Sequence, residues 1–175
     1  ASMHRIPIWD EYGEKYIIAI NASYAGTGAL TENGDYFMWG INNTFQLGTN
    51  RTSGWQYYSG ARYGVPYPTK IDGFSKDADG VKPVIGQSSG TSFVLMSNGQ
   101  VKTMGTADDL ALGQGTSGAV NGVPGTVQTK DGSPLTDAIQ IGFSSVYSDG
   151  LYGLYYTTAY AAKSDGSLWS WGAQN

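Results

Sequence analysis

The chain has 175 residues, a formal net charge of −4 and a pI of about 4.7, and no run of Lys and Arg interrupts this acidic balance, which argues against a nucleic-acid partner. The absence of cysteine excludes disulfides, zinc–thiolate sites and a cysteine nucleophile, and no apolar stretch reaches the roughly 20 residues needed for membrane insertion. With 26 glycines, 40% apolar and 14% charged residues, the composition is typical of a turn-rich globular domain.

The chain opens with an N-terminal segment, residues 1–16, which we expect to be a separate strand or a cap on the domain that follows. Beyond it the first strong signal is Asn33-Gly34, flanked by the strand-like runs Thr27–Glu32 and Asp35–Trp39. Asn-Gly favours a type I′ turn, in which both central residues have positive φ. The pattern therefore predicts a β-hairpin with a two-residue turn.

A long insertion, Thr49–Tyr67, follows this hairpin and is rich in aromatic residues. Tyr and Trp offer rigid faces with a polar tip, which suits stacking on sugars or anchoring a protein. Packing of these rings on sheet edges is the alternative. The ligand-binding candidates of this insertion are Trp55, Tyr57, Tyr58, Arg62, Tyr63 and Tyr67.

Two further hairpins are predicted at Asn98-Gly99 and Asp165-Gly166, which lie 65 and 67 residues after the preceding turn. Strand-like runs again flank each pair. For the second hairpin they are Thr91–Ser97 and Gln100–Met104, and for the third they are Thr158–Ser164 and Ser167–Trp171. Spacing of this kind is typical of an internal repeat.

The repeat extends beyond the turns. Six residues after each turn glycine comes another glycine, and the residue before it is Trp39, Met104 or Trp171. We expect Trp39 and Trp171 to be largely buried, at equivalent places. Leu-Gly then recurs at Leu47-Gly48 and Leu112-Gly113. These offsets predict three repeats, at about residues 17–71, 72–127 and 128–175.

A second group of aromatic residues precedes the third hairpin. It supplies the remaining ligand-binding candidates, with the same alternative of packing between sheets. They are Tyr147, Tyr152, Tyr155 and Tyr156.

The repeat resembles that of the regulator-of-chromosome-condensation family. The resemblance lies in residues 29–42, ALTENGDYFMWGIN, in Gln46-Leu47-Gly48, and in residues 165–175, DGSLWSWGAQN. It implies propeller blades that are four-stranded antiparallel sheets, and a scaffold that works mainly by binding. We therefore expect an all-β, β-propeller-like chain of repeated hairpins.

The chain also departs from the family pattern. A histidine that the family often carries eight residues before the turn glycine is replaced by Gly26, Thr91 and Thr158, and Met104 stands in the place of the motif's tryptophan. Three repeats are fewer than the family's usual ring, and the third reaches no Gln-Leu-Gly equivalent. We expect an open or partial propeller, with edges capped by the N-terminal segment, by loops or by other chains.

No catalytic or metal-binding motif emerges along the chain. Asp77-Ala78-Asp79-Gly80 has its glycine too early for a calcium loop, so a tight turn is the better interpretation. We expect no enzymatic activity, no catalytic residues, no metal and no cofactor. A carboxylate pair for glycoside chemistry, brought together by folding, stays open.

Low charge and aromatic loops favour a non-enzymatic binding module, and we expect a bacterial adhesin, pilus tip or phage fibre domain for cell-surface attachment. Its partner would be a cell-surface glycan or a protein receptor, with no nucleic acid and no membrane insertion, and its location extracellular or on a virion. We expect the chain to form a homo-oligomer or to be part of a longer chain. The alternative that the resemblance implies is a protein-interaction scaffold or a fragment of a small-GTPase exchange factor.

Overall fold

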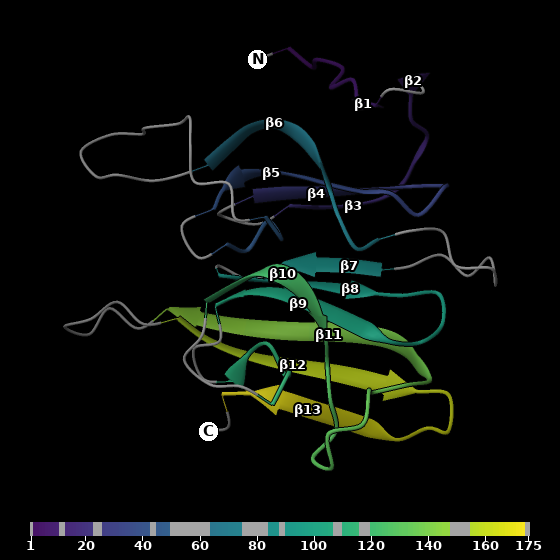
Figure 1. Ribbon diagram of the computed structural model, residues 1–175, viewed down its shortest axis with the longest axis vertical. Helices are drawn as coiled ribbons and strands as arrows, with labels where there is room; N and C mark the ends of the chain where they lie inside the picture. The colour runs from purple at the N-terminus through teal and green to yellow at the C-terminus, as the bar shows by residue number, and fades with distance from the viewer. Residues whose placement is uncertain are drawn as a thin grey trace.

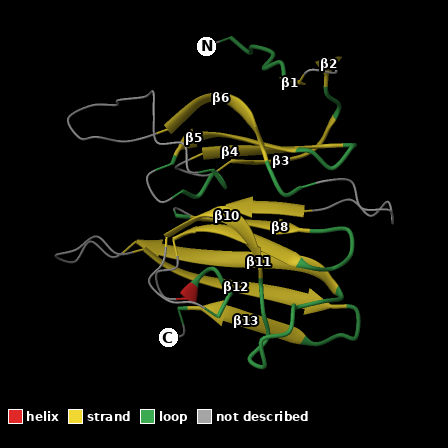
Figure 2. Cartoon of the chain, viewed as in Figure 1, coloured by secondary structure: helices red, strands yellow, loops and turns green. Residues whose placement is uncertain are grey.

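The structure is a computed structural model, and it describes residues 2–10, 13–22, 26–42, 45–49, 64–74, 84–87, 90–106, 110–115, 120–147 and 155–173. Apart from one helical turn at Leu110, the regular structure of these residues is β-strand (Figure 2). The predicted all-β class is confirmed. Within the described ranges no helix is long and apolar enough to span a membrane.

The strands form three antiparallel sheets stacked along the longest axis of the molecule, with a small hairpin at the N-terminal end (Figure 1). The small hairpin consists of β1 (Trp9–Asp10) and β2 (Gly13–Glu14). The first sheet consists of β3 (Ile17–Ala22), β4 (Gly26–Thr31), β5 (Tyr36–Ile41) and β6 (Gly64–Ile71). The second consists of β7 (Val84–Gln87), β8 (Thr91–Leu95), β9 (Val101–Thr106) and β10 (Val120–Thr126). The third consists of β11 (Ala138–Tyr147), β12 (Tyr155–Lys163) and β13 (Leu168–Gly172).

Each sheet is a meander in which neighbouring strands follow one another in sequence. The first strands of successive sheets lie side by side, β3 with β7 and β7 with β11. This is the arrangement of propeller blades around an axis. The three sheets form an arc rather than a closed ring, as expected for a partial propeller.

The three predicted hairpins are confirmed, but the predicted turn type is wrong. Gly34, Gly99 and Gly166 have φ of 79°, 78° and 85°, whereas the residue before each does not have positive φ. In the first hairpin Thr31 N–H donates to Asp35 O and Gly34 N–H to Thr31 O. The turn thus has three residues, with only the glycine left-handed. A type I turn followed by such a glycine is the usual three-residue hairpin connection, so Asn-Gly serves here at its second and third positions.

The outer strands β6 and β10 carry the same irregularity. Between the pairs Val65–Gly40 and Thr69–Met38, β6 has two extra residues relative to β5. Between the pairs Asn121–Gly105 and Gly125–Thr103, β10 likewise has two extra residues relative to β9. Pro68 and Pro124 occupy matching places in these bulges, where a residue without an N–H is tolerated. The first two sheets are therefore the same unit, strand by strand.

Two apolar clusters join the sheets. The first lies between the first and second sheets and includes Tyr36, Met38 and Met104. The second lies between the second and third sheets and includes Leu95, Val101 and the partly buried Trp171. The second sheet thus presents one side-chain face to the first sheet and the other to the third, as strand alternation requires.

The Leu-Gly loops carry the contact from one sheet to the next. Asn42, fully buried, donates to the carbonyl oxygen of Thr49 at 2.8 Å and accepts from the N–H of Leu47 at 3.0 Å, which fixes the first loop. A Cβ on Gly113 would lie 2.7 Å from Trp171 Cδ1, so the loop of the second repeat lies directly against the third sheet.

Trp39 and Trp171 occupy equivalent strand positions, as predicted, opposite Thr27 and Ala159. Both are half-buried rather than largely buried, which corrects the expected burial. Each packs on the border of a cluster instead of inside it, because both lie near the end of a strand.

The N-terminal segment lies against the first sheet, on the face away from the second. Ile8 is buried and forms a small cluster with Ala29 and Phe37, and the half-buried Trp39 packs against it. This face therefore has a cover from the chain itself.

Candidate functional site

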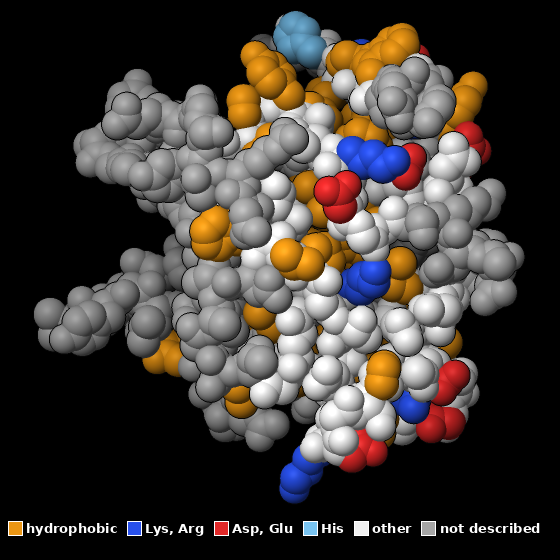
Figure 3. All heavy atoms as spheres, in the orientation of Figure 1, with side chains coloured by type: hydrophobic (Ala, Val, Ile, Leu, Met, Phe, Trp, Pro, Cys, Tyr) orange, Lys and Arg blue, Asp and Glu red, His pale blue; other side chains and the backbone are white. Residues whose placement is uncertain are grey.

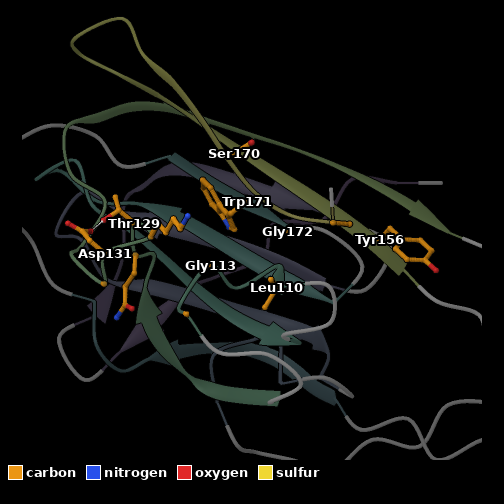
Figure 4. A pocket seen from close by; sticks show the side chains of 13 residues that line it. Leu110, Gly113, Thr129, Asp131, Tyr156, Ser170, Trp171 and Gly172 are labelled. Atoms are coloured by element: carbon orange, nitrogen blue, oxygen red, sulfur yellow. Dashed lines mark hydrogen bonds between the residues drawn. The ribbon is translucent and has the colours of Figure 1, made fainter. Parts of the chain in front are cut away.

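A groove of about 930 Å³ lies beside the last strand of the third sheet (Figure 4). One wall is formed by β13 and the residue after it, from Ser170 to Ala173. The other walls come from the Leu110–Gly115 loop and the Gln128–Gly132 connection. The groove thus lies where the second and third repeats meet.

A tight turn, Thr129–Ser133, forms one end of the groove. It has the same hydrogen-bonding pattern as the hairpin turns, with Thr129 N–H donating to Ser133 O and Gly132 N–H to Thr129 O. Asp131 accepts hydrogen bonds from the Thr129 hydroxyl and from the N–H and hydroxyl of Ser133. These bonds lower the pKa of this exposed carboxyl, and the bond from Thr129 has the largest effect. The turn therefore holds a charged carboxylate at the rim.

Aromatic groups form the middle and the far end of the groove. Trp171 projects between the two repeats, and its indole N–H donates to the carbonyl oxygen of Ala111 at 3.0 Å. Its ring also lies 6.4 Å from that of Phe93, at a tilted angle. Tyr156, half-buried, lines the end away from Asp131 (Figure 4). The groove therefore offers apolar rings with polar groups at its ends, as binding sites commonly do.

Side chains of β13 are far more exposed than their equivalents in the first two sheets. Leu168 is 71% exposed, whereas Tyr36 and Val101, at the same distance after the turn glycine, are 1% and 0% exposed. Ser170 is exposed, whereas Met38 and Thr103 are fully buried. The equivalent side chains of the first two sheets pack against the sheet that follows, whereas no described sheet packs on this face of the third, which is the physical reason.

Of the predicted ligand-binding residues that the structure describes, Tyr156 lines this groove. Tyr67 lies on β6, at the bulge, with 75% of its surface exposed. Tyr147 is paired with Tyr155 at the end of the β11–β12 hairpin. The other candidates lie outside the described residues: Trp55, Tyr57, Tyr58, Arg62, Tyr63 and Tyr152. The hypothesis of one ligand surface made by both aromatic segments therefore stays a prediction.

Sequence reasoning missed the Thr129–Ser133 turn and expected Trp171 to be largely buried rather than part of a groove. One signal could have indicated the turn: Asp131-Gly132 is a further Asp-Gly pair of the kind used to find the hairpins. Nothing local could have placed that turn beside Trp171, because some 40 residues of chain separate them.

Charged side chains do not gather into a field of one sign on the face that Figure 3 shows. Acidic and basic groups both occur on that face in small groups. Two ion pairs of the described residues are Lys70–Asp35 at 2.8 Å and Lys163–Asp137 at 3.9 Å. Among the described residues no group of three or more His, Asp and Glu could hold a metal ion. The groove is therefore distinguished by its rings rather than by charge.

Comparison with solved structures gives clear matches of fold. Human WBSCR16 has a TM-score of 0.66 and 16% identity, over 97% of this chain and 35% of that one. Yeast RCC1 (Prp20), in its complex with Kap60, has a TM-score of 0.62 and 20% identity, over 91% of this chain and 32% of that one. Prp20p from Saccharomyces cerevisiae, described with its binding to Gsp1p and histones, has a TM-score of 0.57 and 23% identity, over 73% of this chain and 28% of that one. The chain thus spans about a third of the length of these proteins. No family model and no curated protein matches it.

These neighbours correct two of our expectations. The yeast Prp20 structures are described with Gsp1p, histones and Kap60, all of them proteins, and not with a glycan or a cell-surface receptor. The interpretation of the chain as an adhesin, pilus tip or phage fibre module that binds carbohydrate is therefore wrong. The expected extracellular or virion location falls with it, since it rested on the same composition.

The resemblance to the regulator-of-chromosome-condensation repeat, in contrast, is confirmed. The matched structures include yeast RCC1 itself, and the described strands repeat as that comparison requires. The chain therefore has the fold of regulator-of-chromosome-condensation repeats, with two complete four-stranded sheets and a third sheet of three described strands.

Proposed function

We propose that the chain is a protein-interaction scaffold, and that it binds a protein partner in the groove beside β13. The observation that carries this proposal is the combination of a groove of about 930 Å³ with the half-buried rings of Tyr156 and Trp171 and the exposed Ser170 along it. Apolar grooves are surfaces on which polypeptides bind. The protein partners described for the yeast neighbours support the same class of function.

Between the two forms of this function that the sequence left open, the groove favours a general scaffold over a fragment of an exchange factor. Its described lining carries one cation and one carboxylate, Lys130 and Asp131, and is otherwise polar or apolar. A surface of this kind suits an uncharged peptide segment. Binding in it depends little on ionic strength, because few exposed charges are involved.

The experiment is a peptide-display selection on the immobilised 175-residue chain, followed by affinity measurements with purified hits. We expect hits whose affinity falls about tenfold or more when Tyr156 is replaced by Ala or Lys130 by Glu. The matched control is Tyr67→Ala, which removes an exposed ring far from the groove and leaves affinity unchanged. Purified Gsp1p, added as a second probe, tests the exchange-factor alternative.

Hits that bind the groove variants as tightly as the parent chain contradict the assignment of the groove. Failure to enrich any sequence contradicts the proposed function as a whole. Thermal unfolding of each variant shows whether the fold is retained, and we expect this for Lys130→Glu because Lys130 is exposed at a turn.

A further inference from the structure

The turn of the first hairpin differs from the other two hairpin turns in what holds its Asn side chain. In the second hairpin Asn98 Oδ1 accepts a hydrogen bond from the N–H of Gln100 at 3.0 Å. In the third, Asp165 Oδ1 accepts one from the N–H of Ser167 at 2.8 Å. Each bond joins the side chain to the main chain two residues later, which is the usual local partner of Asn and Asp in turns. The side chain at this place is therefore held in both hairpins.

In the first hairpin a hydroxyl oxygen accepts that hydrogen bond instead. The N–H of Asp35 donates to Thr31 Oγ1 at 3.1 Å, so it is not directed at Asn33. Thr31 lies two residues before Asn33, where the other hairpins have Met96 and Lys163, whose side chains carry no oxygen. Within the described part of the chain, no hydrogen bond holds the Asn33 carboxamide, and the residue is exposed. This carboxamide is therefore free to rotate.

The glycine that follows the Asn is packed more closely in the second turn. Gly99 is buried, its carbonyl oxygen accepts a hydrogen bond from the N–H of Ala138 at 3.0 Å, and a Cβ on it would lie 2.8 Å from the nitrogen of Asp137. Gly34, in contrast, is half-buried. Any reaction between Asn98 and Gly99 therefore requires release from the third sheet as well as rotation of the Asn98 side chain.

We propose that Asn33 is a self-modification site, at which the chain converts this carboxamide to a carboxylate faster than at its two other Asn-Gly pairs, Asn98-Gly99 and Asn121-Gly122. An Asn-Gly pair suits this reaction because glycine has no side chain to hinder the approach of its nitrogen. Asn121 lies in β10 and pairs with Gly105 of β9, so reaction there needs the strand pair to open. Asn33 differs from both in having an exposed carboxamide that no described group holds.

The reaction is confined to two adjacent residues and water. Hydroxide removes the amide proton of Gly34, and the nitrogen then attacks Cγ of Asn33 to form a C–N bond. The bond from Cγ to Nδ2 breaks, and the leaving nitrogen takes protons from water and departs as ammonia. Water then adds to either carbonyl of the five-membered imide, which gives aspartate or isoaspartate. One water is consumed and one ammonia is released, so neither an oxidant nor a reductant is required.

One barrier to this reaction is common to the first two turns. The N–H of Gly34 donates to Thr31 O at 3.0 Å, and the N–H of Gly99 donates to Met96 O at 3.0 Å. Each bond must open before the nitrogen can lose its proton. Because this barrier is the same in both turns, the difference in rate reports on the side chain and on the contact with the next sheet.

The Thr129–Ser133 turn already has the arrangement of the aspartate product. It has Thr129 at the place of Thr31 and Asp131 at the place of Asn33, and Asp131 accepts hydrogen bonds from the Thr129 hydroxyl and the N–H of Ser133. We therefore expect aspartate at position 33 to keep the turn. Isoaspartate adds a methylene to the main chain and lengthens a connection that two hydrogen bonds define, so we expect it to disrupt the turn.

The test follows the three Asn-Gly pairs in the folded 175-residue chain at mildly alkaline pH, with tandem mass spectrometry of its peptides. We expect conversion at Asn33 to be about tenfold faster than at Asn98, because two further hydrogen bonds must open at the second turn. Both aspartate and isoaspartate should form at Asn33, as opening of an imide requires. In concentrated urea, where no turn is formed, the rates should become similar because the dipeptide is the same.

Two variants test the role of the Thr31 hydroxyl. Thr31→Val releases the N–H of Asp35 to Asn33, and conversion at Asn33 should slow about fivefold while Asn98 is unchanged. Thr31→Ser keeps the hydroxyl and should react like the parent chain. Thermal unfolding shows whether each variant is folded. If Thr31→Val does not fold, the ratio of the rates at Asn33 and Asn98 in the parent chain still decides.

Three results overturn the proposal. Conversion at Asn98 as fast as at Asn33 in the folded chain would mean that a hydrogen bond to Oδ1 activates the carboxamide instead of holding it. Aspartate without isoaspartate at Asn33 would indicate direct hydrolysis without attack by Gly34. An unchanged rate in folded Thr31→Val would show that the Thr31 hydroxyl does not leave Asn33 free.

Discussion

The indole N–H of Trp171 and the carbonyl oxygen of Ala111, 3.0 Å apart, join the third sheet to the second. One repeat earlier the Ser92 hydroxyl donates to the carbonyl oxygen of Gln46 at 2.7 Å, and Gln46 has the same place in its loop as Ala111. The same carbonyl thus accepts a hydrogen bond from the next sheet in both repeats, although the donors differ. Conserving an acceptor on the main chain allows the donor side chain to change between repeats.

Replacing Trp171 with Phe should lower the free energy of unfolding by about 1 to 2 kcal/mol, because it removes this donor and leaves the carbonyl of Ala111 less well satisfied. Urea denaturation measures the change. Trp169→Phe is the matched control, since Trp169 is 40% exposed and its indole N–H donates to the nearby Ser167 hydroxyl rather than to another sheet. Similar losses for both variants would mean that the contact between sheets adds no stability of its own.

A second prediction concerns Gly28, which lies on β4 beneath the ring of Tyr36. A Cβ there would lie 2.7 Å from the Tyr36 hydroxyl oxygen and 3.2 Å from two ring carbons. Tyr36 is buried and cannot withdraw, so Gly28→Ala should cost about 1 to 3 kcal/mol. Gly142→Ala, on β11 with open space around the new methyl, should change stability by less than about 0.5 kcal/mol. A larger loss for Gly142→Ala would contradict this packing.

The turn glycines make a third prediction. Gly166 has φ of 85° and open space around it, so a substitution there is opposed by backbone strain alone. Gly166→Val should cost about 1 to 3 kcal/mol, whereas Gly166→Asn should cost less, because Asn adopts the left-handed region more readily. Thermal melting of the two variants checks the order. Equal melting temperatures would show that the turn adapts.

The fourth prediction concerns the pKa of Asp131, which hydrogen bonds from Thr129 and Ser133 lower. The sign of the pH effect follows from linkage: a carboxyl whose pKa is lower in the folded state stabilises that state above its unfolded pKa, and this contribution is lost as pH falls through the folded pKa. Thr129→Val removes the first of these donors and should raise the pKa. NMR titration of the Asp131 carboxyl carbon measures it, and an unchanged pKa would exclude the Thr129 hydroxyl as its cause.

The sequence by itself determined the hairpins, their spacing and the resemblance to a known repeat. Local chemistry dictates these features, since a glycine such as Gly34 or Gly99 is needed wherever a short turn requires positive φ. The same local signal did not determine the turn type, because Asn-Gly fits both a two-residue and a three-residue connection. Hydrogen bonds along the flanking strands make that choice.

Only the tertiary structure decided where the groove lies and which residues form it. Trp171 and Ala111 meet across 60 residues of chain, and the Thr129–Ser133 turn reaches β13 only because β11 and β12 place that strand beside it. The exposure of Leu168 likewise depends on whether a further sheet packs on its face, while its local sequence resembles that of the buried positions in the other repeats. Local patterns specify strands and turns, whereas burial and binding surfaces arise from contacts between distant segments.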